Sequence, residues 1–281
     1  MKSLLIIFSV SLTLYLVFTL TIYLTQRRQI YCPTSETRSE KYESFFLPVG
    51  SAGERSSRAG IRLKLWRLHP GRGPGLIYFG GNAEDAALNL DQFDRRFPGW
   101  TVYLVNYRGY GGSGGRPSEA ALCRDAVAIF DALKPEHTGL AVLGRSLGSA
   151  VALHLAAARP VSKAALVTPF ASLTGVARAH YFFFPVSRLL KDRYENRAKA
   201  QAVTAPVLVL IAENDEIIPR RESELLVEAL NDKKCKIVTI PGAGHNDLDQ
   251  DPLYFQALET FFKRDLEPQT EEGPVSGPGK A

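Results

Sequence analysis

The chain has few of the residues that cross-link small secreted proteins or build metal sites. Its 281 residues include only three cysteines, Cys32, Cys123 and Cys235. This odd number, without a recognisable spacing, predicts no disulfide framework. No His-Glu-x-x-His, paired Cys-x-x-Cys or calcium-loop pattern is present in the sequence. We therefore expect neither a metal nor another cofactor.

A strong charge of one sign is also missing. The net charge is +5 at pH 7, and the basic residues are scattered along the chain. This distribution argues against nucleic acid as a partner. Two glycine-rich stretches lack the context of a nucleotide site. Residues 71–75 have no Lys-Ser/Thr pair, and residues 109–114 fit G-x-G-x-x-G but do not open a helix directly.

One long stretch has no charged residue at all. Leu4 to Leu24 is strongly apolar, and 21 helical residues would span about 30 Å, the thickness of a bilayer core. A signal peptide has a shorter apolar region and ends in small residues, which residues 21–28 do not offer. We expect residues 4–24 to be a single-pass anchor in the lipid bilayer. Positive charges flank both ends of this segment: Lys2 and the α-amine on one side, and Arg27, Arg28, Arg38 and Lys41 on the other. The orientation is therefore open, and the positive-inside rule leans towards a cytoplasmic location for the rest of the chain.

The remaining residues, about 250, can form one large α/β core. Short apolar runs predict strands, and apolar residues at helical spacing predict helices. The expected strands are residues 61–68, 75–79, 101–105, 140–143, 164–168, 206–211 and 235–240. The expected helices are residues 119–133, 149–156, 222–230 and 253–262.

The most informative segment is residues 144–148, which fits G-x-S-x-G. An apolar strand precedes it and a helix of small and apolar residues follows it, which is the context of a nucleophile elbow. The two glycines let strand and helix pass without a Cβ clash. We predict that Ser146 is a nucleophile and that the backbone N–H of Leu147 binds an oxyanion.

A nucleophilic serine needs a base, which in this architecture comes last along the chain, after the acid. His245 lies in a glycine-rich loop just after the expected strand at 235–240. His180 has no turn residues around it. Catalytic groups of such folds lie in loops at the carboxyl ends of strands, so His245 is the predicted base.

The acid should also follow a strand. Three carboxylates follow the expected strand at 206–211, namely Glu213, Asp215 and Glu216. Asp215 is the predicted acid because it lies mid-loop, before an apolar pair and the helix-starting Pro219. Glu213 is the alternative.

A second oxyanion donor usually comes from the loop after an earlier strand. The loop at residues 80–83 follows the expected strand at 75–79 and begins with two glycines, so its backbone can approach a reacting carbonyl. We assign the Asn82 N–H as the donor, with Ala83 as the alternative. Such a donor contributes about 3 kcal/mol to transition-state stabilisation.

Taken together, these segments resemble the α/β-hydrolase fold superfamily. Within it, the chain looks like the branch that includes membrane-anchored bacterial hydrolases and the eukaryotic protein depalmitoylases. The matching segments follow the family's order and cover roughly residues 60–265; they are residues 80–83, 106–113, 117–119, 144–148, 169–173, 215–219 and 242–247. The resemblance implies a mostly parallel central sheet flanked by helices, with a short cap insert at residues 174–202.

The chain departs from this family at two places. Gly80 replaces the histidine of the family's His-Gly-Asn loop, which leaves the backbone donor but removes a side chain that supports the loop. The cysteine-rich N-terminal segment of the depalmitoylases is absent, so their substrate does not carry over to this chain.

The expected organisation has four parts: an anchor at residues 4–24, a linker and first strand at 25–58, an α/β-hydrolase domain at 59–265 and a disordered tail at 266–281. The predicted function is a membrane-anchored serine hydrolase that cleaves an ester or thioester of a small or acyl substrate. A serine peptidase acting on small peptides and a non-catalytic, membrane-tethered binding protein remain alternatives. The sequence does not indicate the oligomeric state.

Four phenylalanines are candidates for the acyl-binding side of the pocket. Phe170 follows the strand beyond the elbow, and Phe182, Phe183 and Phe184 lie in the cap insert. Three consecutive phenylalanines cannot all face inward on a helix or strand, so at least one should face the cleft or the bilayer. The alternative is ordinary core packing.

Overall fold

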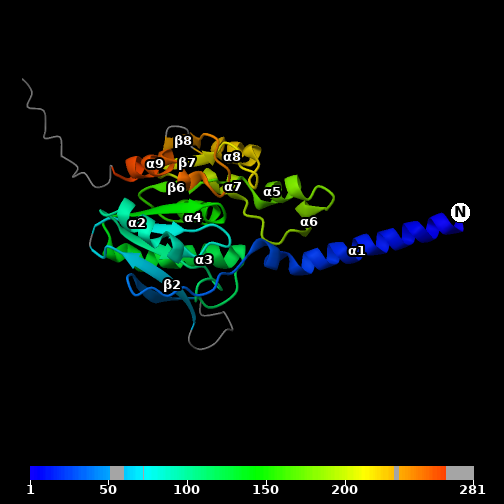
Figure 1. The fold of residues 1–281 in the computed structure, drawn as a ribbon, viewed down its shortest axis with the longest axis horizontal. Coiled ribbons are helices and arrows are strands. Elements are labelled where there is room, and N and C mark those ends of the chain that lie inside the picture. The colour runs from blue at the N-terminus through cyan, green and yellow to red at the C-terminus, as the bar shows by residue number, and fades with distance from the viewer. Residues whose placement is uncertain (51–59, 72, 231–233, 264–281) are drawn as a thin grey trace, which may run out of the picture.

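A central sheet of eight strands organises the chain in the computed structural model, which describes residues 1–50, 60–71, 73–230 and 234–263 (Figure 1). The strands are β1 (Glu43–Val49), β2 (Ile61–Leu68), β3 (Gly75–Phe79), β4 (Thr101–Val105), β5 (Leu140–Arg145), β6 (Ala164–Val167), β7 (Val207–Ala212) and β8 (Cys235–Ile240). They lie in the order β1-β2-β4-β3-β5-β6-β7-β8. β2 runs antiparallel to both its neighbours, and the strands from β4 to β8 are parallel. The prediction of a mostly parallel sheet is confirmed.

The central strands are buried on both faces. Every residue of β3, β4 and β6 is buried, as expected for parallel strands that helices cover on both sides. The apolar runs of the sequence therefore gave the strand positions to within two residues.

Helices form a layer on each face of the sheet. They are α2 (Leu90–Arg96), α3 (Glu119–Leu133), α4 (Leu147–Ala158), α8 (Arg220–Val227) and α9 (Pro252–Lys263). Residues of α3, α4 and α8 belong to one hydrophobic core, and residues of α2 and α9 belong to the other. The first core includes Leu122 and Val151, and the second includes Phe93 and Phe262.

A short cap joins β6 to β7, as the resemblance implied. It contains three short helices, α5 (Leu173–His180), α6 (Val186–Leu189) and α7 (Asn196–Ala200). Figure 1 shows α5 and α6 at the end of the domain from which the N-terminal helix leaves.

That N-terminal helix, α1 (Lys2–Ile30), extends away from the domain (Figure 1). It is long and apolar enough to cross a membrane, and its most apolar window is not buried within the protein. The prediction that a linker begins at residue 25 is wrong. The helix continues to Ile30, and Gln26 and Tyr31 are buried against the domain. Hydropathy marks the apolar segment but not the point at which the backbone leaves the helix. The tail at residues 266–281 lies outside the described residues.

Candidate active site

The predicted elbow joins β5 directly to α4. Ser146, between them, has φ of +51° and ψ of −115°, a conformation that non-glycine residues rarely adopt. A Cβ on Gly144 would overlap the Gly148 carbonyl, and a Cβ on Gly148 would overlap the Phe79 carbonyl. Glycine is therefore required at both positions, and the strained turn presents the Ser146 side chain at the carboxyl end of β5.

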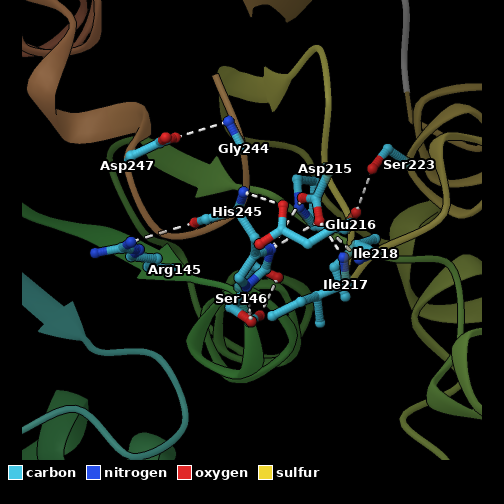
Figure 2. A network of polar contacts seen from close by, with 12 residues as sticks. Arg145, Ser146, Asp215, Glu216, Ile217, Ile218, Ser223, Gly244, His245 and Asp247 are labelled. Carbon is cyan, nitrogen blue, oxygen red and sulfur yellow. Dashed lines mark hydrogen bonds and ion pairs between the residues drawn. The ribbon is translucent and has the colours of Figure 1, made fainter. Parts of the chain in front are cut away.

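Three side chains from different loops meet at this point (Figure 2). The Ser146 Oγ lies 2.9 Å from the His245 Nε2. The His245 Nδ1 lies 2.9 Å from Oδ2 and 3.0 Å from Oδ1 of Asp215. His245 and Asp215 are both almost fully shielded from solvent, with side-chain exposures of 6% and 7%. This hydrogen-bonded chain of hydroxyl, imidazole and carboxylate is the arrangement that serine hydrolases use.

The structure separates the two candidate acids. The backbone N–H groups of Ile217 and Ile218 both donate to Asp215 Oδ1, at 3.0 and 2.7 Å, and so fix the carboxylate that faces His245. The Glu213 carboxylate instead accepts a hydrogen bond from the Gly242 N–H at 2.7 Å. Geometry therefore favours Asp215 over Glu213 as the partner of the imidazole.

The loop that carries His245 is held by polar contacts that the sequence did not predict. Glu216 accepts a hydrogen bond from the His245 backbone N–H at 3.0 Å, and Asp247 accepts one from the Gly244 N–H at 2.7 Å. From the elbow, the Arg145 guanidinium donates to the His245 carbonyl at 3.3 Å. The carboxylate at position 216 was visible in the sequence, but only the fold brings it to this backbone.

The two residues predicted as oxyanion donors line the same cavity as Ser146. Leu147 is the first residue of α4, where a backbone N–H has no partner within the helix. Asn82 lies in the loop after β3. The Asn82 side-chain oxygen accepts hydrogen bonds from the Cys32 N–H at 2.9 Å and the Tyr110 hydroxyl at 2.8 Å. These contacts fix the position of the loop that carries Asn82.

A carboxylate supports this loop where the family's histidine is missing. The Glu84 carboxylate accepts hydrogen bonds from the Gly81 N–H at 2.7 Å and the Tyr78 hydroxyl at 2.6 Å. A Cβ on Gly80 would lie only 2.6 Å from Glu84 Oε1, so the carboxylate occupies the space beside this glycine. The Tyr107 hydroxyl donates to the Gly80 carbonyl at 2.7 Å. Sequence reasoning identified the missing histidine but not Glu84 as its replacement.

A cavity of about 330 Å³ extends from Ser146 between α1 and the cap. Phe170 and Phe184 line it, as predicted. Phe182 and Phe183 are a correction, because they lie outside its lining and are 72% and 71% exposed. Phe182 and Phe183 lie in an irregular turn after α5, and their rings lie together outside the cavity, with centroids 3.7 Å apart.

The cap is also tied to the acid loop. The His180 imidazole, at the end of α5, lies 2.8 Å from the Ile217 carbonyl through its Nε2. His180 therefore contributes to the cavity wall rather than to the chain that contains Ser146. Among the residues that the structure describes, no group of three or more His, Cys, Asp or Glu side chains is arranged to hold a metal ion.

Known proteins are similar to this chain in sequence. Residues 91–195 and 186–251 match the family described as serine aminopeptidase, S33. The chain is 38% identical over 234 residues to the uncharacterized protein Rv2307c of Mycobacterium tuberculosis, which covers 80% of this chain and 82% of that protein. It is 31% identical over 215 residues to the protein bem46 of Schizosaccharomyces pombe, with 71% of each chain covered.

A solved structure supports the same fold. The esterase Pf2001 of Pyrococcus furiosus superposes with a TM-score of 0.65 at 16% identity, over 84% of this chain and 99% of the esterase. The resemblance inferred from the motifs is confirmed. The chain therefore belongs to the α/β-hydrolase superfamily, in the family described as serine aminopeptidase, S33.

Proposed function

We propose that this hydrolase is a membrane-anchored serine esterase or thioesterase that works through an acyl-enzyme. The single observation that carries the proposal is the hydrogen-bonded chain from Ser146 through His245 to Asp215, with Ser146 in the lining of a mostly apolar cavity. Each member has a separate chemical role, and the second member is within hydrogen-bonding distance of both others.

The reaction then has two balanced halves. Ser146 Oγ attacks the acyl carbon while His245 Nε2 accepts the hydroxyl proton, and Asp215 holds the imidazole in the required tautomer. The N–H groups of Leu147 and Asn82 bind the developing oxyanion. His245 gives its proton to the departing alcohol or thiol, which leaves Ser146 acylated. Water then adds to the acyl carbon, His245 takes its proton, and the same proton returns to Ser146 as the carboxylic acid leaves.

The cavity lining favours an ester or thioester over a peptide. An aminopeptidase must bind the α-amino group of its substrate, which is largely protonated near neutral pH and calls for a carboxylate. Among the described residues, none that lines this cavity is Asp or Glu. Its wall consists mostly of aliphatic and aromatic side chains, which suit an apolar acyl group.

The anchor is part of the same proposal. The apolar window of α1 is not buried within the protein, unlike the core helix of a soluble domain. A cleaved signal peptide is disfavoured because the helix continues past the apolar run into residues that pack on the cap, including Gln26. The basic pair Arg27 and Arg28 favours a cytoplasmic catalytic domain.

A comparison of substrates tests the proposal. We expect the full-length protein, purified in detergent, to hydrolyse p-nitrophenyl esters and acyl thioesters, and to leave leucine p-nitroanilide intact. Both activities should disappear in Ser146→Ala. Cleavage of leucine p-nitroanilide that depends on Ser146 would instead identify a peptidase. A folded protein that hydrolyses none of these substrates would support the non-catalytic binding protein.

A further inference from the structure

The anchor helix forms part of the wall of the cavity that contains the nucleophile. One side of α1 contributes six lining residues: Thr19, Ile22, Tyr23, Gln26, Gln29 and Ile30. The opposite wall comes from the cap and includes Val176, Tyr181, Phe184 and Leu189. The cavity is thus enclosed by a helix long enough to cross a membrane and by the insert between β6 and β7.

We propose that α1 is a wall of the acyl-binding site, in addition to tethering the enzyme. In this arrangement the acyl chain of the substrate lies between α1 and the cap, with its carbonyl at Ser146. This inference rests on the proposed function for the identity of the bound group. It adds that residues of the membrane helix determine which acyl chains are accepted.

Polar contacts fix the C-terminal part of α1 against the cap. Gln26 is 6% exposed; its side-chain amide donates to the Leu189 carbonyl at 3.1 Å and accepts from the Lys191 N–H at 2.7 Å. The next residue, Arg27, makes two hydrogen bonds to the buried Asp192, at 2.8 and 3.0 Å. Two-point recognition of this kind fixes orientation as well as distance. The helix therefore holds a defined position relative to the cap.

Aromatic contacts continue this interface into the apolar part of α1. The ring of Phe184 stacks on Tyr15, with centroids 5.9 Å apart, and lies 5.6 Å from the ring of Phe18. The Tyr15 hydroxyl donates to the Phe183 carbonyl at 3.0 Å. Tyr15 lies near the middle of the apolar run at residues 4–24, so the tip of the cap reaches the level of the bilayer. This position accounts for the exposed rings of Phe182 and Phe183, which would face lipid.

The lining of the cavity suits an apolar chain that carries a polar group. Ser146 and Asn82 belong to this lining, and most of the other lining residues are aliphatic or aromatic. Along α1, the lining from Thr19 to Ile30 extends over about 16 Å. Because Thr19 belongs to the apolar run, an acyl chain that enters at the level of the bilayer would reach Ser146 along a lining that is mostly apolar, with Gln26 and Gln29 as its polar members on α1.

A substitution in the α1 wall tests the inference. Ile22→Trp adds bulk to the lining, whereas Leu24→Trp, two residues later, makes the same kind of change at a residue that is 67% exposed. With the full-length protein in detergent, kcat/KM is measured for p-nitrophenyl esters from two to twelve carbons. We expect Ile22→Trp to lower the ratio of dodecanoate to acetate about tenfold, equivalent to about 1.4 kcal/mol. Leu24→Trp should keep the wild-type ratio. An unchanged ratio in Ile22→Trp, or an equal loss for all esters, would overturn the inference.

A binding measurement separates this inference from the proposed function. In the Ser146→Ala background, a fluorescent dodecanoyl probe should bind about tenfold more weakly when Ile22→Trp is added, and equally well when Leu24→Trp is added. If the wild type hydrolyses no ester but this difference in binding is found, the proposed function fails and the role of α1 stands. If hydrolysis is found but Ile22→Trp changes neither binding nor the chain-length ratio, the role of α1 fails and the proposed function stands.

Discussion

The two walls of the cavity differ in the contacts that hold their side chains. In the sheet-side wall, which includes Ser146, Ile217 and Ile218, hydrogen bonds fix polar groups, as between Asp215 and the Ile217 and Ile218 N–H groups. In the cap-side wall, formed by α1 and the cap, most lining side chains are aliphatic or aromatic, although Gln26 also lines the cavity and donates to the Leu189 carbonyl.

Under the proposed function, the two walls would have separate tasks. Stabilising a transition state requires donors and acceptors within a few tenths of an ångström of fixed positions. Recognising an acyl chain requires mainly shape and apolar surface. Polar substitutions in the sheet-side wall should therefore affect every substrate alike, whereas substitutions in the cap-side wall should change the order of preference among substrates.

The largest expected effect on activity is at Asp215, in the sheet-side wall. Asp215→Asn should lower kcat by about 10⁴-fold, because an amide favours the wrong imidazole tautomer. The loss should be the same for short and long esters. Glu213→Gln is the matched control and should stay within a few-fold of the wild type, since Glu213 contacts the Gly242 N–H instead. Steady-state ester hydrolysis measures both, and the reverse ranking would mean that Glu213 is the acid.

A smaller effect is expected at Glu84. Glu84→Gln should lower kcat about tenfold, less than the loss of an oxyanion donor itself, because the loop keeps its backbone but loses a carboxylate acceptor for the Gly81 N–H. Asn89→Ala removes only a peripheral donor to Glu84 and should have less effect. The measurement is kcat across the ester series. A change confined to long esters would place Glu84 with the acyl-binding wall instead.

Substitutions in the cap-side wall should change the preference among esters of different acyl-chain length. Phe184→Ala should lower the dodecanoate-to-acetate ratio of kcat/KM by about fivefold, roughly the value of one or two buried methylenes. Phe182→Ala is the control, because its ring is exposed and outside the lining. A uniform loss for all esters, together with a lower Tm, would show that Phe184 only packs the core.

The smallest effect is expected on stability, at Glu222, which connects α8 to the start of the cap. Burial raises the pKa of Glu222, which accepts a hydrogen bond from the Ser172 N–H at the start of α5. The folded state therefore holds this proton more tightly than the unfolded chain, and its stability falls as the pH rises from 4.5 through the raised pKa. Glu222→Gln keeps an acceptor without this charge.

Thermal unfolding at two pH values checks that expectation. The Tm of Glu222→Gln should equal that of the wild type near pH 4 and exceed it slightly at pH 7. A mutant that is less stable at pH 7 than at pH 4, relative to the wild type, would show that the charged carboxylate stabilises this junction.

Local pattern predicted the strands and the three residues of the hydrogen-bonded chain in the sheet-side wall, but not the supporting contacts of Glu84 and Glu216. Only glycine fits at positions 144 and 148, so the elbow has a spacing that can be recognised in the sequence. Asp215 and His245 were identified because they lie in loops that follow apolar strands. The same patterns gave the strand positions because central parallel strands are buried on both faces. Whether these residues carry out catalysis stays a prediction that the experiments above address.

The cap-side wall could not be predicted in the same way. Its contacts join residues about 165 positions apart, as between Arg27 and Asp192, and no local spacing encodes them. Residues 182–184 are all phenylalanine, so the sequence does not indicate that Phe184 is the one that lines the cavity. On the sheet side, the contacts of Glu84 could not be predicted either, because the space beside Gly80 exists only in the folded loop.

The most direct test of the account is the site at which a fluorophosphonate probe reacts with the full-length protein. Such probes react covalently with an activated serine, so the test does not require the natural substrate. Peptide mapping by mass spectrometry should find the adduct on Ser146, and Ser146→Ala, folded by its thermal melt, should remain unlabelled. An adduct on another residue, or equal labelling of Ser146→Ala, would contradict the assignment of Ser146 as the nucleophile.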